Sequence, residues 1–382
     1  MTMSCFELGP IRPPSEAESI LLRLTRNCHW NKCAFCPVYK NAKFSMRKPD
    51  EIKKDIDSIA RIAQKIYQKL NERYPDRKDN TAVAQVVQDL NFGDDAGEAC
   101  GRQVAFWIFH GMKSLFLQDA DALVLRTDHL VEILNYVRDK FPTVERITTY
   151  SRAKTVSRKA FDELAKLRQA GLNRIHIGME SGSDAVLDLI CKGVTAEEQI
   201  RAGQNAVKAG FELSEYFMPG VGGKEYSREN VVESARVLNA TNPTFIRIRS
   251  TVPSPGTPLY DMMLDKTWSP LTDEEKVGEI KLLIQNLQGI RSIVQSDHIM
   301  NLLEDVSGSL PEEKDRMLAV IEEFQGMNKD DRESFIVGRR AGRYRYLSDF
   351  APSAEVELLK RQIKSRYSSI EEGIREILAH YI

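Results

Sequence analysis

Residues 19–36 read SILLRLTRNCHWNKCAFC and join an apolar run to three closely spaced cysteines. The first ten of these residues predict a strand, because high apolar content is typical of a strand that is covered on both faces. Cys28, Cys33 and Cys36 then fall in the loop that follows this strand. Thiols this close together, in a chain with only six cysteines, indicate a metal site rather than a disulfide framework.

Strand and helix patterns alternate along the chain after this loop. Strands are predicted at residues 114–119, 145–152, 174–181, 212–220 and 245–251. Helices are predicted at residues 127–140, 157–170, 183–190, 195–209 and 227–239. Such alternation indicates parallel pairing, and right-handed crossovers then curl the sheet. We therefore expect an α/β fold with a partial (β/α)6 barrel of the TIM type and parallel strands, plus a helical C-terminal region.

Two segments lie outside this alternation. A helix is predicted over residues 51–70, and about 73–112 are expected to form an insertion, polar to about 98 and helical from 101.

A core domain of residues 1–265 is expected, followed by a helical region of residues 266–382. Its first helix starts at a capping box, Thr272 to Glu275, and runs to about 294. Residues 297–382 are predicted to be helical throughout, with a last apolar stripe at Ile370, Ile374, Ile377 and Tyr381.

The composition is that of an ordinary globular protein, with 42% hydrophobic and 29% charged residues. The net charge of −1 excludes a protein that coats nucleic acid through overall basicity. No apolar run approaches the roughly 20 residues of a membrane span, and the N-terminal residues lack the layout of a secretory signal. These features predict a soluble, cytoplasmic protein.

Three thiolates on one short loop can ligate three irons of a cubane cluster and leave the fourth iron open. An open iron can bind a substrate or a cofactor, and a loop after the first barrel strand lies at the face where such folds carry chemistry. Structural zinc is the alternative, although zinc prefers four ligands and His29 is too close to Cys28 for ordinary spacing. Cys5, Cys100 and Cys191 have no partner spacing and are expected to be lone thiols.

The cysteine loop resembles that of the radical S-adenosylmethionine (SAM) enzymes. In that family three cysteines follow the first barrel strand, and the last two are spaced as in Cys33-Ala34-Phe35-Cys36. The first gap departs from the family pattern, since four residues rather than three separate Cys28 from Cys33. The resemblance covers about residues 19–265.

The resemblance implies a set of SAM contacts at the loop and at the ends of the strands. Phe35 would contact the adenine, and Gln118-Asp119-Ala120-Asp121 stands where the family binds the SAM ammonium. Glu180 would reach the ribose or methionine part, and the glycine-rich stretch at Gly220 would back the adenine. In the last predicted strand, Arg249, and less favourably Arg247, is placed to clamp a carboxylate. The candidate cofactor-binding residues are Phe35, Gln118, Asp119, Asp121, Glu180, Gly220 and Arg249.

The resemblance also implies the chemistry. Cys28, Cys33 and Cys36 would hold a [4Fe-4S] cluster, and a reductant of the flavodoxin or ferredoxin type would supply one electron. SAM would then be cleaved to methionine and a 5′-deoxyadenosyl radical that takes hydrogen from a small-molecule substrate. His298, just after a predicted helix, is a candidate substrate contact or proton donor.

Two other functions stay open at this point. The first is an iron–sulfur protein that transfers electrons or a cluster without cleaving SAM. The second is a radical SAM enzyme that modifies RNA, because arginines and tyrosines alternate in residues 339–346, RRAGRYRY. Most such stretches are solvated surface, so nucleic acid is the less favoured partner, and no membrane is expected.

Overall fold

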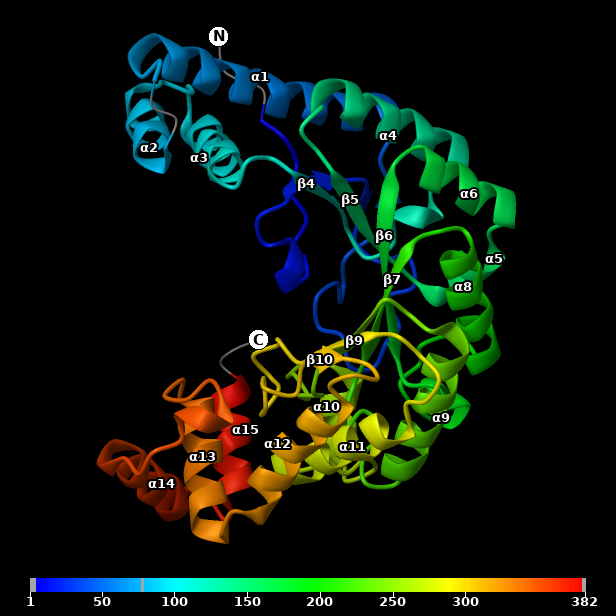
Figure 1. Ribbon diagram of the computed structural model, residues 1–382, viewed down its shortest axis with the longest axis vertical. Coiled ribbons are helices and arrows are strands. Elements are labelled where there is room, and N and C mark those ends of the chain that lie inside the picture. Colours follow the sequence, from blue (N-terminus) through cyan, green and yellow to red (C-terminus); the bar gives the residue numbers. More distant parts are fainter. Residues whose placement is uncertain (1–4, 77–78, 380–382) are drawn as a thin grey trace. The chain divides into compact units, whose positions relative to one another are not determined.

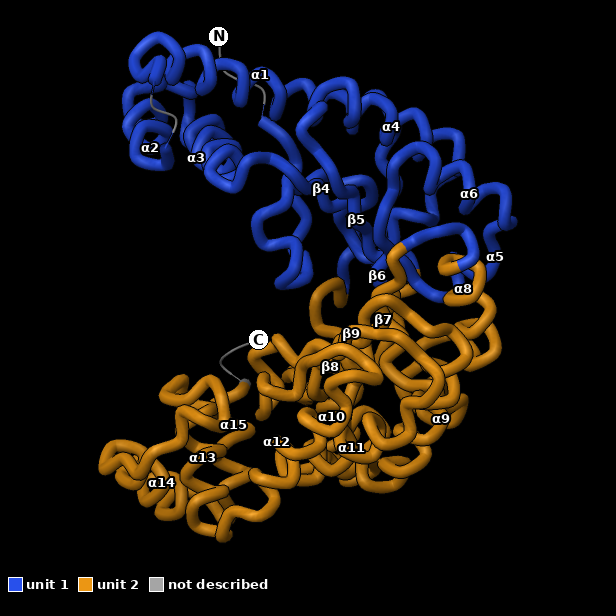
Figure 2. The backbone as a smooth tube through the Cα atoms, viewed as in Figure 1, with its two compact units in different colours: residues 1–29, 41–176, 208–211 blue, residues 30–40, 177–207, 212–382 orange. Residues whose placement is uncertain are grey.

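The structure, a computed structural model, describes residues 5–76 and 79–379. The chain divides into two compact units (Figure 2). Unit 1 holds the described parts of residues 1–29, 41–176 and 208–211, and unit 2 holds residues 30–40, 177–207 and those from 212 on. Each unit combines parallel strands with helices, so the α/β class is confirmed.

Unit 1 contains three parallel strands and the helices around them (Figure 1). β1 pairs with β4, and β4 pairs with β5. The elements are η1 (Pro14–Glu16), β1 (Ile20–Arg23), β2 (Thr25–Arg26), β3 (Ser45–Met46), α1 (Pro49–Arg73), α2 (Asn80–Asp89), α3 (Asp95–Phe109), β4 (Ser114–Gln118), η2 (Ala122–Val124), α4 (Thr127–Lys140), β5 (Arg146–Ser151), α5 (Ala153–Arg158) and α6 (Phe161–Gln169). β6 (Leu172–Glu180) begins in unit 1 and ends in unit 2.

Unit 2 contains the last parallel strands and the C-terminal helices. β7 pairs parallel with β8, and β8 with β9. The elements are α7 (Asp184–Leu189), α8 (Ala196–Lys208), β7 (Glu212–Phe217), α9 (Ser227–Thr241), β8 (Phe245–Ile248), α10 (Pro258–Leu264), α11 (Asp273–Asn286), β9 (Ile293–Gln295), β10 (Gly308–Ser309), α12 (Lys314–Gly326), α13 (Lys329–Arg340), η3 (Leu347–Asp349), α14 (Ala354–Arg366) and α15 (Ile370–Ala379).

The polar stretch at 73–98 contains a helix that the sequence prediction missed. α2 starts where the Asp79 carboxylate accepts a hydrogen bond from the Ala82 backbone N–H at 2.9 Å. α3 starts in the same way at Asp94, which accepts from Gly97 at 2.9 Å. Aspartates in the N-cap position were therefore the signal that could have revealed both helix starts.

The prediction for the residues after 286 was partly wrong. α11 begins at the predicted Thr272 capping box but ends at Asn286, and Gly289 has a φ of +69°. Ile293, Val294 and Gln295 then pair with Phe245, Ile246 and Arg247 of β8. The C-terminal region is therefore mainly helical but also supplies the short strands β9 and β10, so residues 297–382 are not helical throughout. Val294 of β9 belongs to the same buried core as Ile246.

The helices after residue 310 share one hydrophobic core with β7, β8 and β9. Phe217, Ile248, Leu283 and Phe335 all belong to this core, as do the predicted stripe residues Ile370 and Ile374. Ile377 packs against it, whereas Tyr381 lies outside the described residues. The helical C-terminal region is thus confirmed as part of unit 2.

The prediction that Cys5 and Cys100 are lone thiols was wrong. The two residues form a disulfide with their Cα atoms 6.0 Å apart. The N-terminal segment folds back onto α3, where the Phe6 ring lies 5.4 Å from that of Trp107. Because 95 residues separate the two cysteines in sequence, spacing carried no sign of this contact. Cys191 is a free, exposed thiol, as expected.

Candidate functional site

The cysteine loop, residues 28–36, carries three partly exposed cysteines that form no disulfide. Its second half is seated in unit 2 by backbone hydrogen bonds. The Ala34 N–H donates to the Ile190 carbonyl at 2.8 Å, and the Ala34 carbonyl accepts from Leu259 N–H at 3.0 Å. Ala34 itself is buried in a small core, against which Phe35 packs. These contacts fix the chain between Cys33 and Cys36 without using either thiol.

Trp30 provides a second anchor for the loop. Its indole N–H donates to the Cys191 carbonyl at 2.7 Å. A Cβ atom at Gly193 would overlap the Trp30 ring, so only glycine allows this close approach. Gly193 also has a φ of +67°, which residues with a side chain rarely adopt. The turn after α7 is therefore shaped to receive the loop.

The three thiols fit an iron–sulfur cluster by their chemistry. Within the described residues no three His, Cys, Asp or Glu side chains are grouped to hold a single metal ion. A cubane cluster needs something else, one thiolate for each of three separate irons. Three partly exposed thiols on one loop are the donors that this chemistry requires.

The residues at the end of β4 are buried and engaged within unit 1. The Gln118 amide bonds the backbone of the N-terminal segment, accepting from Gly9 N–H at 2.9 Å and donating to the Gly9 and Ile11 carbonyls at 3.1 Å. Asp119 accepts from Arg23 Nε at 2.8 Å and from Asn27 N–H at 3.0 Å. The predicted contact of these residues with SAM stays a prediction.

Asp121 is also buried, with 1% of its surface exposed. One carboxylate oxygen accepts from the Ser151 hydroxyl at 2.7 Å, and the other lies 2.9 Å from His29 Nε2. The Thr155 hydroxyl donates to that second oxygen as well. Asp121 therefore connects β4 to the residue that follows Cys28.

Phe35 and Glu180, two of the predicted SAM contacts, are brought together in unit 2 by Lys192. The Lys192 ammonium donates to Glu180 Oε1 at 2.8 Å and lies 5.7 Å from the centre of the Phe35 ring. Glu180 ends β6 with a φ of +64°. Its carboxylate folds back over Gly178, where a Cβ atom would collide with it. The sequence prediction missed Lys192, which follows Cys191 in a turn without a recognisable motif.

Gly220 is held by a residue of the C-terminal region. Its N–H donates to Glu279 Oε2 of α11 at 2.7 Å, and Asn230 Nδ2 donates to the same oxygen at 3.3 Å. Burial raises the pKa of Glu279 to about 7, although hydrogen bonds from Ser227, Gly220 and Asn230 oppose the shift. Gly220 has a φ of +81°, which a residue with a side chain rarely adopts.

Arg249 and His298 lie together at the end of β8. The Asn301 side chain holds the backbone on both sides of Arg249, accepting from Ser250 N–H at 2.9 Å and donating to the Ile248 carbonyl at 2.7 Å. His298 Nδ1 accepts from Met300 N–H at 3.2 Å. Burial and the nearby Arg249 charge lower the pKa of His298 to about 4, so its ring is neutral at pH 7 and carries its proton on Nε2.

Arg247 differs from Arg249 in its surroundings. Its side chain is buried, donates to Ser214 at 3.2 Å and pairs with Asp297 at 3.2 Å. Arg249 is exposed. Of the two, Arg249 is therefore the one available to a ligand.

The arginines of residues 339–346 do not form an open basic patch. Arg340 is buried against the buried Asp273 at 2.8 Å, and Arg339 is buried against Glu304 at 2.6 Å. Arg345 pairs with Glu304 as well, and Arg343 pairs with Glu355. Arg339 and Arg340 at the end of α13 are thus paired inside the fold, and Arg343 and Arg345 form ion pairs at the surface, which the sequence pattern did not reveal.

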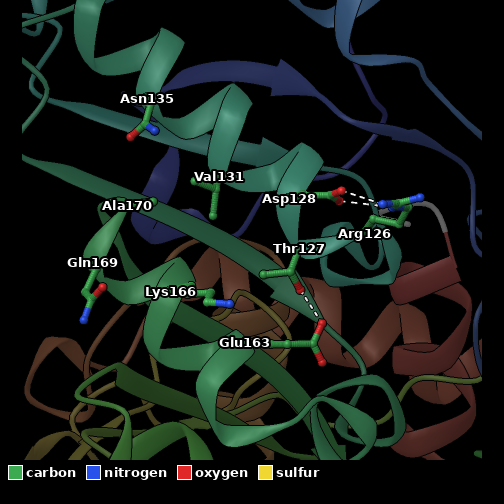
Figure 3. Close-up of a pocket in the computed structure, with 9 residues that line it drawn as sticks. All are labelled: Arg126, Thr127, Asp128, Val131, Asn135, Glu163, Lys166, Gln169 and Ala170. Atoms are coloured by element: carbon green, nitrogen blue, oxygen red, sulfur yellow. Dashed lines mark hydrogen bonds and ion pairs between the residues drawn. The ribbon is translucent and has the colours of Figure 1, made fainter.

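A surface groove of about 670 Å³ lies between α4 and α6 in unit 1 (Figure 3). It is lined by side chains such as Thr127, Asp128, Glu163 and Lys166. Thr127 and Glu163 are joined by a hydrogen bond of 2.6 Å. Because the groove lies between helices rather than at the ends of parallel strands, it is not where folds of this class carry chemistry.

Each unit is an α/β unit in which polar residues follow the ends of parallel strands. Residues 98–236 of the chain match the family model described as Radical SAM superfamily. The match supports the predicted resemblance to the radical SAM superfamily for this part of the chain. The cofactors of that superfamily are a [4Fe-4S] cluster and SAM. The matched segment begins after α1 and α2, so the cysteine loop precedes it.

Curated relatives match over shorter segments. An uncharacterized methyltransferase of Pyrococcus horikoshii is 24% identical over 45% of this chain and 37% of its own length. The tRNA uridine(34) acetyltransferase of Methanocaldococcus jannaschii is 24% identical over 30% of this chain and 21% of its own length. The chain thus spans well under half of either relative.

Among solved structures, methylornithine synthase is similar with a TM-score of 0.41 and 15% identity, covering 74% of this chain and 66% of that one. The radical SAM methyltransferase TsrM of Kitasatospora setae is similar with a TM-score of 0.44 and 12% identity, covering 91% of this chain and 61% of that one. Similarity at this level carries no argument about activity. No described helix has the length and hydropathy needed to span a bilayer.

Proposed function

We propose that this radical SAM enzyme holds its cluster through Cys28, Cys33 and Cys36 and acts on a small-molecule substrate. The observation that carries the proposal is the cysteine loop itself, three partly exposed thiols that follow the first strands of the chain. The radical SAM match of the following strands and helices supports it.

The chemistry that such a cluster supplies with SAM is one-electron cleavage of the SAM carbon–sulfur bond, which yields a 5′-deoxyadenosyl radical. This chain's residues would bind and orient SAM. We assign this role to Phe35, Glu180, Gly220 and Arg249, which all belong to unit 2. Lys192 would hold Glu180 in place, and Glu279 would hold the Gly220 loop, since both make direct hydrogen bonds to them.

His298 is proposed as a substrate contact. Its Nε2–H is a neutral donor at pH 7 beside the exposed Arg249 guanidinium. Together the two side chains offer hydrogen bonds and one positive charge, which suits a substrate with a carboxylate or phosphate group.

The first test is anaerobic reconstitution with iron and sulfide, followed by reduction with SAM present and assay of 5′-deoxyadenosine. Cys33→Ala should abolish its formation, and the matched control Cys191→Ala, which removes a free exposed thiol outside the loop, should leave it unchanged. A bound cluster without SAM cleavage under several reductants would favour an electron-transfer protein. Retention of zinc instead of iron would contradict the proposal.

RNA modification is a second candidate, because curated relatives named for tRNA modification match part of the chain. The paired arginines of α13 give it no open basic surface there. Binding of a tRNA transcript, measured at low and at high salt, tests it. If alanine at the exposed Arg343 and Arg345 leaves salt-dependent binding unchanged, the RNA site lies elsewhere. If no RNA binds at low salt, this candidate is excluded.

A further inference from the structure

Two buried carboxylates at the end of β4 hold the residues on either side of Cys28. Asp119, with 0% of its surface exposed, accepts from the Asn27 backbone N–H at 3.0 Å. Asp121, with 1% exposed, lies 2.9 Å from the His29 ring nitrogen. Asn27 and His29 are the immediate neighbours of Cys28. One turn after β4 therefore holds the first cysteine from both sides.

The backbone before Cys28 needs this support. Asn27 has a φ of +68°, in the left-handed region that few residues other than glycine and asparagine adopt readily. Its side chain donates to the Lys43 carbonyl at 2.6 Å while its N–H is bound by Asp119. The Leu24 N–H also donates to the Gln118 carbonyl at 2.9 Å. The path of the chain into Cys28 is thus fixed from β4.

Other residues of unit 1 also bond these two carboxylates. Asp119 forms an ion pair of 2.8 Å with Arg23, and Asp121 accepts from the Ser151 and Thr155 hydroxyls as well as facing His29. Each carboxylate is therefore already engaged in holding neighbouring parts of unit 1 together. This arrangement favours an indirect role over the direct SAM contact that the family resemblance implies.

We propose that Asp119 and Asp121 are positioning residues that hold Cys28 in place for cluster binding, an inference that rests on the proposed function. Residues that orient metal ligands in this way commonly change metal retention by about 10- to 100-fold when replaced. Loss of either carboxylate should therefore loosen Cys28 and the iron that it would hold, with SAM affinity per cluster unchanged.

The variants are Asp119→Asn and Asp121→Asn, which keep the side-chain size and remove the charge. The matched control is Asp128→Asn in α4. Asp128 also bonds an arginine side chain and a backbone N–H, from Arg126 and His129, but is exposed and lines the groove between α4 and α6 (Figure 3). His29→Gln is a further variant that leaves the buried carboxylates intact, in case their replacement prevents folding.

Three readouts are measured on protein with equal iron loading: the rate of iron loss to a chelator, the electron paramagnetic resonance spectrum of the reduced cluster, and the SAM dissociation constant. We expect iron loss about tenfold faster in both aspartate variants and in His29→Gln, with an altered spectrum and the same SAM dissociation constant. The control should behave as the wild type. Normal iron retention with weakened SAM binding would overturn the inference and support direct SAM contact.

Hydrogen exchange of the cluster-free protein separates this inference from the proposed function. The Asn27 amide should exchange faster in Asp119→Asn than in the wild type, since it loses a charged acceptor. A wild type that takes up no cluster would overturn the proposed function and, with it, the role of the carboxylates. Unchanged exchange together with unchanged iron retention would overturn the positioning role alone.

Discussion

Glu215 in β7 is a fully buried carboxyl group, and burial raises its pKa from 4.5 to about 8 despite a hydrogen bond from Thr241. The folded state therefore keeps a proton there that the unfolded chain loses. The contribution of Glu215 to the free energy of unfolding should be fully present below about pH 4.5 and fall as the pH rises toward 8, by about 1.4 kcal/mol per pH unit.

Glu215→Gln should flatten this dependence, because the amide does not titrate. Urea unfolding of the cluster-free protein between pH 5 and 8 measures it. Glu212→Gln, at an exposed position of the same strand, serves as the control. A difference between wild type and Glu215→Gln that stays constant over this pH range would contradict the prediction.

Gly193→Ala should displace Trp30 and lower the iron content of the reconstituted protein, since the new methyl group would overlap the indole ring. Gly256→Ala is a close control. Gly256 has a similar φ of +79° but nothing within 4 Å of the added carbon. Trp fluorescence and bound iron are measured in both, and equal losses of iron would show that backbone strain alone is responsible.

At the level of single residues, the sequence did not predict most contacts. Arg249 was chosen over Arg247, and the structure leaves Arg249 exposed while Arg247 is paired with Asp297. Lys192 was missed because it bonds Glu180, 12 positions before it in sequence. Asn301 was missed because it bonds the backbone at Ser250, 51 positions before it. Spacing in the sequence carries no information on contacts of this kind.

At the level of elements, the start of α11 makes a direct test. Thr272 Oγ1 accepts from Glu275 N–H at 3.1 Å, and Glu275 Oε2 accepts from Thr272 N–H at 2.7 Å. Thr272→Ala should lower the free energy of unfolding by about 1 kcal/mol. Thr267→Ala, whose hydroxyl bonds a carbonyl and caps no helix, should cost less in the same urea titration.

Most strands and helices with a strong period were predicted within a few residues. α4 was predicted at its observed bounds, residues 127–140. Two predictions failed. The helix expected at 157–170 is two helices, α5 and α6, and the residues that begin β9 were predicted as the end of a helix. A strand of three residues has too few positions to show a period, and only its pairing with β8 makes it a strand.

At the level of the whole molecule, we expect that a chain ending at residue 265 will not fold cooperatively. It would expose the edge of β8 and remove Leu283, Ile284 and Val294, which are fully buried in the core of unit 2. Thermal unfolding followed by circular dichroism, beside the full chain, measures this. A sharp transition in the shortened chain would contradict it and support a domain boundary near 266.

The side chain of Asn301 bonds both backbone neighbours of Arg249, and Glu279 bonds the Gly220 loop. The C-terminal region, which holds the proposed substrate contact His298, thus also holds the proposed SAM contacts in place. Replacing the C-terminal region by an unrelated one would therefore remove the hydrogen bonds that hold Arg249 and the Gly220 loop. A change of substrate specificity in this lineage would have to proceed by substitution within the existing tail, under the constraint that cofactor binding survives every step.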